Sequence, residues 1–361
     1  MNVLSLFDGM SCGQQALNRC GFEVTNYYAS EIDKYAIKVT QHNFPNTIQL
    51  GSVVDVDVNS LPKIDLLIGG SPCQSFSFAG KRKGMATKCE QEILTLEHYL
   101  ELKKEGFEFE GQSYLFWEYM RILNDIRKSN PNVYFLLENV EMGEKWELIL
   151  NKAIGVKGIH INSSLVSAQN RKRIYWTNIG MKPGGLFGDL ESIIKQPKDK
   201  GILLKDILET EVDEKYFLSE KMLKYFIKNT YKQKENGNGF KFNPTDGNKK
   251  SNSITTKEGT RMDDNFILNN TSEIIATQLG KSENFGNCMS DKGKSYTLRK
   301  SEPNGVILNS RIRRLTPIEC ERLQTVKDNY TNCVSDSQRY KMLGNGWTIN
   351  VICHIFNYMK L

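Results

Sequence analysis

One cysteine of this chain stands in a setting suited to covalent chemistry. Cys73 lies in the stretch "GGSPCQS", directly after the apolar run "IDLLI", which predicts a buried strand. Pro72 fixes the backbone before the thiol, and the flanking glycines and serines leave room for a substrate. Doubly wound folds bind ligands at the carboxyl ends of such strands. Cys73 is therefore a candidate nucleophile, weighed against the commoner role of an unpaired cysteine as a small buried hydrophobe.

A carboxylate stands in a similar position further along the chain. In "VYFLLENV", Glu138 and Asn139 follow a run of apolar residues that predicts a second buried strand. A glutamate there is as often a cap or a turn residue. A cysteine and a glutamate at the ends of two neighbouring strands could instead converge on one substrate as nucleophile and proton-handling partner.

A glycine-containing turn near the amino terminus indicates a nucleotide-like ligand. In "LSLFDGMSCG" a strand ends near Phe7, and Asp8, Gly9 and Gly13 form a turn that opens a helix. Glu31, in "YASEID", follows the next strand at about the distance where an acidic side chain reaches ribose hydroxyls. Together these features favour an adenosine-containing cofactor and leave NAD and S-adenosylmethionine both open.

The elements that must position these residues alternate along the first part of the chain. We expect strands in "NVLSLF", "VTNYYASEI", "IDLLIGG" and "VYFLLENV", and helices in "GQQALNRCGF", with Gly21 as its stop, and in "DKYAIKVTQHNF". Strands this apolar are buried on both faces. The pattern predicts an α/β fold with a parallel, Rossmann-like sheet covered by helices.

The composition of the sequence becomes more polar from about residue 181. Stretches such as "YKQKENGNGFKFNPTDGNKKSNS" are polar and predict loops and short strands. Amphipathic helix returns in "IRRLTPIECERLQTV", and "YKMLGNGWTINVICHIFNYM" predicts a loop and then an apolar helix that rejoins the first core. We therefore expect a catalytic domain of residues 1–180 and 341–361 and an inserted smaller domain of residues 181–340.

Composition narrows the class of protein. The chain has 361 residues, a net charge of +6, eight cysteines without a CxxC pair and four histidines. We expect reduced thiols, no structural zinc and no disulfide framework. No stretch is apolar enough to span a membrane, and the amino terminus lacks the pattern of a signal peptide, so we expect a cytoplasmic protein. Basic clusters in "GKRKG", "QNRKRIYW" and "RIRRLT" could neutralise phosphates or simply be solvated.

These motifs, in this order, resemble the DNA cytosine-5 methyltransferases. "LSLFDGMSCG" is similar to the family's first motif, "GGSPCQSFSFAGKRKG" to its Pro-Cys motif, "ENV" to its glutamate motif and "QNRKRIY" to its Gln-x-Arg-x-Arg motif. "RRLTPIECERLQ" and "MLGNGWTINVI" are similar to its ninth and last motifs. The resemblance covers the chain except for about residues 181–310, where the family has its variable target-recognition region.

The resemblance implies a catalytic role for four residues. Cys73 would add to C6 of a cytosine, and Glu138 would contact the N3 edge of the base and assist proton transfer. Arg171 would lie near the base, and Arg173 near the thiolate. The family flips its target cytosine out of the duplex, because C5 and C6 are inaccessible in the base stack.

The resemblance also implies the binding residues. Those for S-adenosylmethionine would be Phe7, Asp8, Gly9, Gly13, Glu31, Ile32, Pro72, Leu115 and Asn345. Those for double-stranded DNA would be Gln74, Ser75, Lys81, Arg82, Lys83, Gln169, Arg313 and Arg314. The segment "SFSFAGKRKGM" would close over the flipped base from the minor-groove side.

The chain departs from the family pattern at three places. Ser52 stands where the family usually has an aspartate that contacts the adenine. Two alternatives are open: Asp55 takes over this contact, or no residue does. The last motif reads Gly-Asn-Gly-Trp where Gly-Asn-Ser-Val is commoner. Residues 85–111 are longer than in compact members and predict an added helix in "EQEILTLEHYLELKKEGF", which either touches DNA or, as we favour, braces the neighbouring loop.

Other functions remain open at this point. One branch of the same family methylates transfer RNA, although the polar region of about 130 residues favours a reader of duplex DNA. A catalytically silent DNA-binding protein on this scaffold is a second alternative, and without the resemblance a nicotinamide-dependent oxidoreductase would be a third. We expect a monomer that binds neither metal nor membrane and that has a possible cognate restriction endonuclease.

Overall fold

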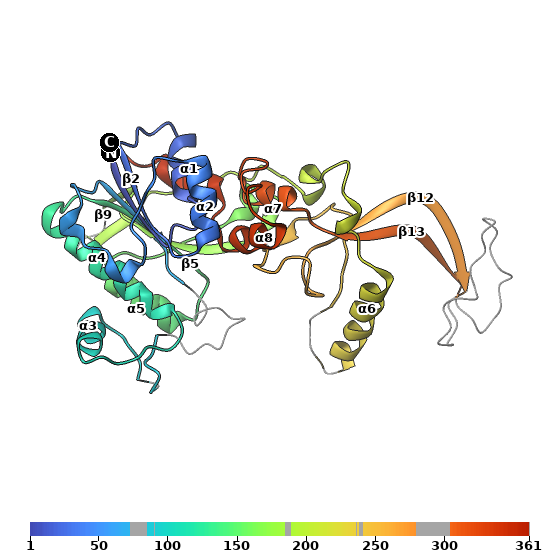
Figure 1. Cartoon of the computed structure of the whole chain (residues 1–361), viewed down its shortest axis with the longest axis horizontal. Coiled ribbons are helices and arrows are strands. Elements are labelled where there is room, and N and C mark those ends of the chain that lie inside the picture. The colour runs from blue at the N-terminus through green and yellow to red at the C-terminus, as the bar shows by residue number, and fades with distance from the viewer. Residues whose placement is uncertain are drawn as a thin grey trace.

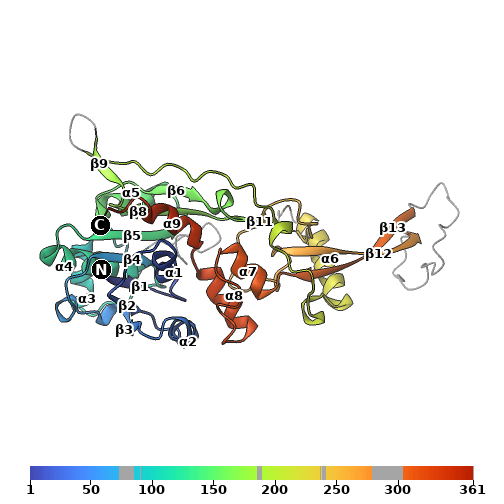
Figure 2. The ribbon, with the colours of Figure 1, turned by 90° about the horizontal axis from the view of Figure 1, so that it is seen from above.

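A central sheet of seven strands carries the first part of the chain. The computed structural model describes residues 1–72, 85–89, 91–184, 189–235, 237, 241–278 and 304–360. The strand order is β3-β2-β1-β4-β5-β8-β6 (Figures 1 and 2). The first five strands in this order are parallel to one another, whereas β8 runs antiparallel to both β5 and β6. The strands are β1 (Asn2–Leu6), β2 (Asn26–Ser30), β3 (Ile48–Gln49), β4 (Leu66–Gly70), β5 (Tyr134–Val140), β6 (Ile159–Asn162) and β8 (Lys172–Thr177). The predicted α/β fold with a mainly parallel sheet is confirmed.

The apolar strands bury both faces of the sheet, as their composition requires. Val3 and Ile68 belong to one buried cluster, whereas Leu4 and Leu67, their neighbours in the chain, belong to the other. The first cluster includes residues of α1 (Cys12–Arg19), α2 (Lys34–Asn43) and α9 (Ile349–Phe356). The second includes residues of α3 (Leu96–Lys104), α4 (Phe116–Ser129) and α5 (Glu144–Ile154). Side chains that alternate between two helical layers therefore hold the sheet in place.

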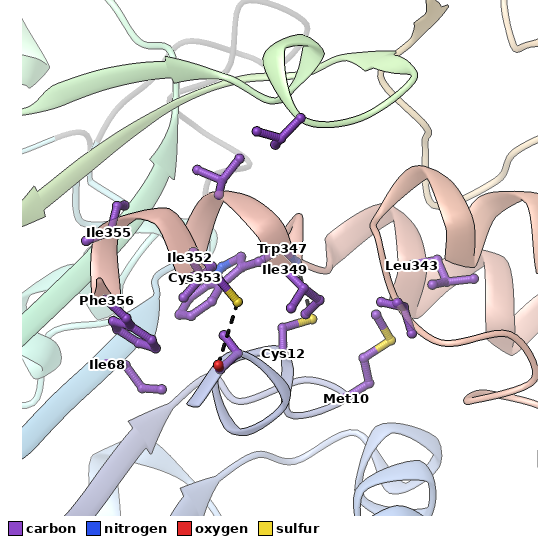
Figure 3. Packing of buried hydrophobic residues seen from close by; sticks show 14 of the residues in the cluster. Met10, Cys12, Ile68, Leu343, Trp347, Ile349, Ile352, Cys353, Ile355 and Phe356 are labelled. Atoms are coloured by element: carbon purple, nitrogen blue, oxygen red, sulfur yellow. Dashed lines mark hydrogen bonds between the residues drawn. The ribbon is translucent and has the colours of Figure 1, made fainter. Parts of the chain in front are cut away.

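The carboxyl-terminal helix closes the first cluster. Helix α9 packs against α1, and the Cys353 thiol lies 3.6 Å from the Ala16 carbonyl oxygen, which accepts its hydrogen bond (Figure 3). Helices α7 (Pro317–Leu323) and α8 (Asp336–Asn345) also contribute Cys320, Leu323 and Leu343 to this cluster. The predicted boundary places α7 in the smaller domain and divides α8 between residues 340 and 341. The proposed domain boundaries stay a prediction.

The region after the sheet is more regular than the sequence indicates. It holds β9 (Met181–Gly184) paired with β10 (Asp189–Ser192), and β7 (Gln169–Asn170) paired with β11 (Ser251–Asn252). It also holds helix α6 (Glu220–Glu235) and a long antiparallel pair of β12 (Phe266–Gln278) with β13 (Asn304–Arg314), which extends away from the sheet in Figure 1. The prediction of loops and short strands alone was wrong here, because α6 carries an apolar stripe inside a polar composition.

One helix was also misjudged near the carboxyl terminus. "YKMLGN" forms the second half of α8 rather than a loop. The chain leaves the helix at Gly346, and a side-chain carbon there would lie 2.8 Å from Cε of Met10. Among the described residues, no helix is both long and apolar enough to cross a lipid bilayer.

Candidate active site

A cavity of about 680 Å³ lies at the carboxyl ends of β1, β2, β4 and β5. All nine residues predicted to bind the cofactor line it, as do Glu138, Arg171 and Arg173. Cys73 lies outside the described residues, but Ser71 and Pro72, which lead into it from β4, are part of the wall. The structure therefore brings together residues that lie far apart in the sequence, while the role of each one stays a prediction.

The turn after β1 is built in an unusual backbone conformation. Phe7, Gly9 and Ser11 have φ angles of 56°, 59° and 57°, in the left-handed region that favours glycine. Two of the three are not glycine, and backbone strain of this kind costs about 1–3 kcal/mol per residue. Such strain persists where the surroundings fix the conformation, and here the turn forms one wall of the cavity.

Hydrogen bonds fix that turn through Asp8. Its carboxylate accepts hydrogen bonds from the hydroxyls of Tyr27, at 2.8 Å, and of Ser11. Burial raises the pKa of the Asp8 carboxyl to about 6. Gly13 lets the helix that follows approach the sheet, because a side-chain carbon there would lie 2.1 Å from Cδ1 of Ile68. These contacts therefore hold the turn in one conformation at the edge of the cavity.

Glu31 and Ile32 form the wall beside this turn. The Glu31 carboxylate accepts hydrogen bonds at 2.8 Å from the backbone amides of Gly9, Ile32 and Asp33. A carboxylate has about four acceptor positions, so the geometry leaves capacity for a ligand hydroxyl. The Ile32 side chain is 71% exposed, which provides apolar surface for a flat ring. Ser52 also lines the cavity, whereas Asp55 does not line it.

Helix α8 adds a polar residue that sequence reasoning missed. Gln338 lines the cavity, and its buried side-chain oxygen accepts no hydrogen bond from the described residues. An unpaired buried acceptor calls for a donor, and a ligand amino group in the cavity would supply one. No signal in the sequence marked Gln338, because it lies outside the recognised stretch "MLGNGWTINVI".

The opposite wall carries an ion pair. Arg173, on β8, places Nε 3.0 Å from Oε1 of Glu138 at the end of β5, and the two side chains are only 15% and 10% exposed. Antiparallel pairing of β5 with β8 sets Val140 opposite Arg173 in this register. The adjacent Asn139 donates a hydrogen bond of 3.0 Å to the Ser71 hydroxyl, which ties β5 to the segment that leads into Cys73.

Arg171 joins three parts of the chain. Its guanidinium donates hydrogen bonds to the Ser253 hydroxyl at 3.1 Å and to the carbonyl oxygens of Gly344 and Gly346 at 3.1 and 2.8 Å. The side chain is therefore held in place before any substrate arrives, at the junction of the sheet, the last motif and the inserted region.

Trp347, the unusual residue of the last motif, lies beside the cavity wall that holds Glu138 and Arg173. Its backbone amide donates a hydrogen bond of 3.4 Å to Sγ of Cys12, and both residues line the cavity (Figure 3). A side-chain carbon at Gly70 would lie 2.9 Å from the indole Nε1 and 3.3 Å from Oε2 of Glu138. Burial raises the pKa of the Cys12 thiol to about 12, so this cysteine is not a nucleophile at neutral pH.

Two residues predicted to bind DNA lie in the interior instead. Gln169 is fully buried and donates a hydrogen bond of 2.8 Å to the Leu323 carbonyl oxygen. Arg313 is 2% exposed and forms two hydrogen bonds of 2.8 Å with the buried Glu319. Their burial contradicts direct contact with DNA, and both serve to hold elements together.

The other predicted DNA contacts are not contradicted. Arg314 is partly exposed and donates a hydrogen bond to the Lys215 carbonyl oxygen at 3.0 Å. The remaining five lie outside the described residues: Gln74, Ser75, Lys81, Arg82 and Lys83.

Helix α3, in the long segment before Leu115, packs against helix α4. In α3, the Tyr99 hydroxyl and the Lys103 ammonium contact Oε1 of Glu118 at 2.6 and 2.5 Å, and Arg121 contacts Oε2 at 2.7 Å. Burial opposes ionisation of Glu118, but these hydrogen bonds outweigh it and lower its pKa. Arg121, on α4, also donates hydrogen bonds to the Val53 and Val56 carbonyl oxygens, and Val53 lines the cavity. The segment thus contacts the helix that supports the cavity wall, whereas the loop that it was predicted to brace lies outside the described residues.

The sheet order, and the cavity at the carboxyl ends of its strands, match a Rossmann-like methyltransferase fold. Residues 1–361 match the family model of the C-5 cytosine-specific DNA methylases, and the chain belongs to this family of enzymes. Enzymes of this family methylate cytosine in DNA and generally use S-adenosylmethionine.

Relatives match this chain over most of its length. The orphan methyltransferase M.SPRI of Bacillus phage SPR is 28% identical, over 99% of this chain and 96% of its own. The type II methyltransferase M1.ScrFI of Lactococcus lactis subsp. cremoris is 29% identical, over 92% of this chain and 72% of its own. The solved Entamoeba histolytica methyltransferase EhMeth has the same fold, with a TM-score of 0.65 at 16% identity and coverage of 99% and 97% of the two chains.

Proposed function

We propose that the protein flips a cytosine out of duplex DNA at a specific sequence and methylates its C5 with S-adenosylmethionine. One observation carries the proposal: a single cavity joins the Glu138–Arg173 pair and the entry to Cys73 with the Glu31 wall. A base on one side and a cofactor on the other could meet inside it.

The residues of the Glu31 wall fit S-adenosylmethionine. Glu31 would accept hydrogen bonds from the ribose hydroxyls, Ile32 would cover the adenine ring, and Gln338 would accept a hydrogen bond from an amino group. The bound cofactor supplies an electrophilic methyl group. This wall binds and orients it, and excludes water from it.

The residues of the opposite wall would act on the base. Addition of the Cys73 sulfur to C6 forms a C–S bond, and Glu138 assists by sharing a proton with N3. The electron-rich C5 would then take the methyl group, with S-adenosylhomocysteine as the leaving product. Transfer of the C5 proton to solvent would expel the Cys73 thiolate, which breaks the C–S bond and restores the aromatic ring. Arg173 holds the Glu138 carboxylate in place through their 3.0 Å contact.

The test is methyl transfer from tritiated S-adenosylmethionine to unmethylated bacterial genomic DNA, with the product mapped by bisulfite sequencing. We expect methylcytosine in a fixed sequence context, abolished by Cys73→Ser. Transfer RNA serves as a parallel substrate. Incorporation into transfer RNA alone would assign the protein to the RNA branch, and DNA binding without incorporation into either substrate would indicate a silent scaffold.

Binding of the cofactor is measured separately by calorimetry with S-adenosylhomocysteine. Glu31→Ala is expected to weaken this binding at least tenfold, since it removes a charged hydrogen-bond partner. Cys73→Ser should leave binding unchanged. Equal affinity of Glu31→Ala and the parent protein would contradict the assigned wall.

A further inference from the structure

Helix α6 presents an exposed face that the proposed chemistry does not use. Lysines 221, 224, 228 and 232 and tyrosines 225 and 231 are all exposed, and the two tyrosines are 62% and 65% exposed. At 3.6 residues per turn, these six residues fall within an arc of about 120°. We call them the lysine–tyrosine face.

The opposite side of α6 explains why this face points outward. Phe226 is 2% exposed and packs against Phe242 and Phe266, with ring centroids 5.3 and 5.5 Å apart. This aromatic contact fixes the rotation of the helix about its axis. Figure 1 shows α6 projecting away from the central sheet.

The face is cationic: its four lysines share the arc with one carboxylate, that of the exposed Glu235. Among the described residues, its lysines have one ion pair, between Lys224 and Glu220 at 3.9 Å, and both of those side chains are largely exposed. Protein interfaces are depleted in lysine, so a second folded protein is a poor match for this face. A polyanion is a better match, because lysines that bind phosphates release counterions.

The spacing of the lysines also suits nucleic acid. Lys221 and Lys232 lie about 16 Å apart along the helix axis, which equals the rise of about five nucleotide steps of one DNA strand. Tyrosine hydroxyls are among the groups that bind phosphate oxygens.

We propose that the lysine–tyrosine face binds the phosphate backbone of duplex DNA outside the base-reading contacts. The proposal rests on the proposed function, because it takes DNA as the substrate. The face would add affinity that does not depend on sequence and would not contribute to the chemistry.

The test compares the full-length protein with K221Q/K224Q/K228Q/K232Q. Glutamine keeps the helix propensity of lysine, so α6 is expected to persist. Affinity for a 40-base-pair duplex of arbitrary sequence is measured by fluorescence anisotropy at several salt concentrations. We expect a loss of roughly tenfold to a hundredfold, and a salt slope that is smaller by about 0.9 for each lysine that contacts a phosphate.

The matched control is K63Q/K128Q/K152Q/K157Q, which removes the same charge. These four lysines are exposed. Lys63 and Lys157 shortly precede β4 and β6, and Lys128 and Lys152 lie in the last turns of α4 and α5, the helices that lead into the amino ends of β5 and β6, opposite the edge that holds the cavity. The control should keep nearly full affinity. Equal losses in the two variants, or no loss in the α6 variant, would overturn the proposal.

Two further readouts separate this proposal from the proposed function. Methyl transfer at saturating DNA should be unchanged in the α6 variant, whereas failure of the parent protein to methylate DNA would concern the function itself. If thermal melting shows that the quadruple variant is destabilised, K221Q/K224Q and K228Q/K232Q are each expected to show about half of the loss in affinity. Weaker binding of transfer RNA with unchanged binding of duplex DNA would also overturn the proposal.

Discussion

Charged side chains serve opposite purposes in the cavity and on α6. At the cavity, Glu138 and Arg173 are nearly buried and lie 3.0 Å apart. On the described part of α6, four lysines are exposed, and Lys224 forms a long ion pair with Glu220, at 3.9 Å. Buried pairs are weakly screened and fix geometry, whereas exposed charges are screened by salt and attract a polyanion over a distance. Substitutions in the two regions should therefore differ in the size of their effect and in its dependence on salt.

Among substitutions of the described residues, the largest effect is expected from Glu138→Gln. Loss of the carboxylate removes the proposed proton-handling group and leaves Arg173 without its partner, so kcat should fall by about 10²–10⁴. DNA affinity at saturating cofactor should change little, and this change should not depend on salt. Single-turnover methyl transfer and anisotropy measure the two quantities. A loss confined to DNA affinity would show that Glu138 acts in binding rather than in chemistry.

Arg313→Leu tests whether a buried arginine contributes to protein stability rather than to DNA binding. The substitution leaves Glu319, which is fully buried, without its ionic partner, and should lower the free energy of unfolding by about 3–5 kcal/mol. Arg313→Leu with Glu319→Gln should be less destabilised. Chemical denaturation measures both variants. A normally stable Arg313→Leu protein that binds DNA weakly would restore the predicted DNA contact.

Gly70→Ala tests the close approach of Trp347 to the cavity wall that holds Glu138. The added methyl would lie 2.9 Å from the indole nitrogen, so overpacking should cost about 1–3 kcal/mol and lower kcat about tenfold. Trp347→Val in the same chain should relieve the contact and recover most of the loss. The four-variant cycle is measured by thermal melting and methyl transfer. Additive effects of the two substitutions would show that the residues do not interact.

The smallest effect is expected from Asp8→Asn and depends on pH. Burial raises the pKa of Asp8 from 3.8 to about 6, so the folded protein holds this proton more tightly than the unfolded chain does. The corresponding stability is complete below about pH 4 and is lost as the pH rises through about 6. The loss is roughly 1–3 kcal/mol. Denaturation from pH 4 to 8 should show this component in the parent protein but not in Asp8→Asn; parallel profiles would contradict it.

The local sequence predicted those strands whose residue pattern alone distinguishes them. The runs "NVLSL", "LLIGG" and "YFLLENV" form β1, β4 and β5 within one or two residues of the predicted strands, because apolar strands bounded by turns are encoded locally. All nine residues that the resemblance assigned to the cofactor line one cavity, and their role in binding stays a prediction. Helix α6 was missed because the prediction for this region rested on its polar composition rather than on residue spacing.

The sequence by itself determined the family, the strands β1, β2, β4 and β5 of the seven-stranded sheet, and twelve of the residues that line the cavity. Only the tertiary structure decided which charged residues are buried. Arg173 and Arg313 belong to similar basic clusters, yet one faces Glu138 in the cavity and the other is enclosed with Glu319. Tertiary structure also decided that Gln338, in α8, and Trp347, between α8 and α9, line the cavity. Burial and partners depend on contacts between segments far apart in the chain, and the local sequence does not contain them.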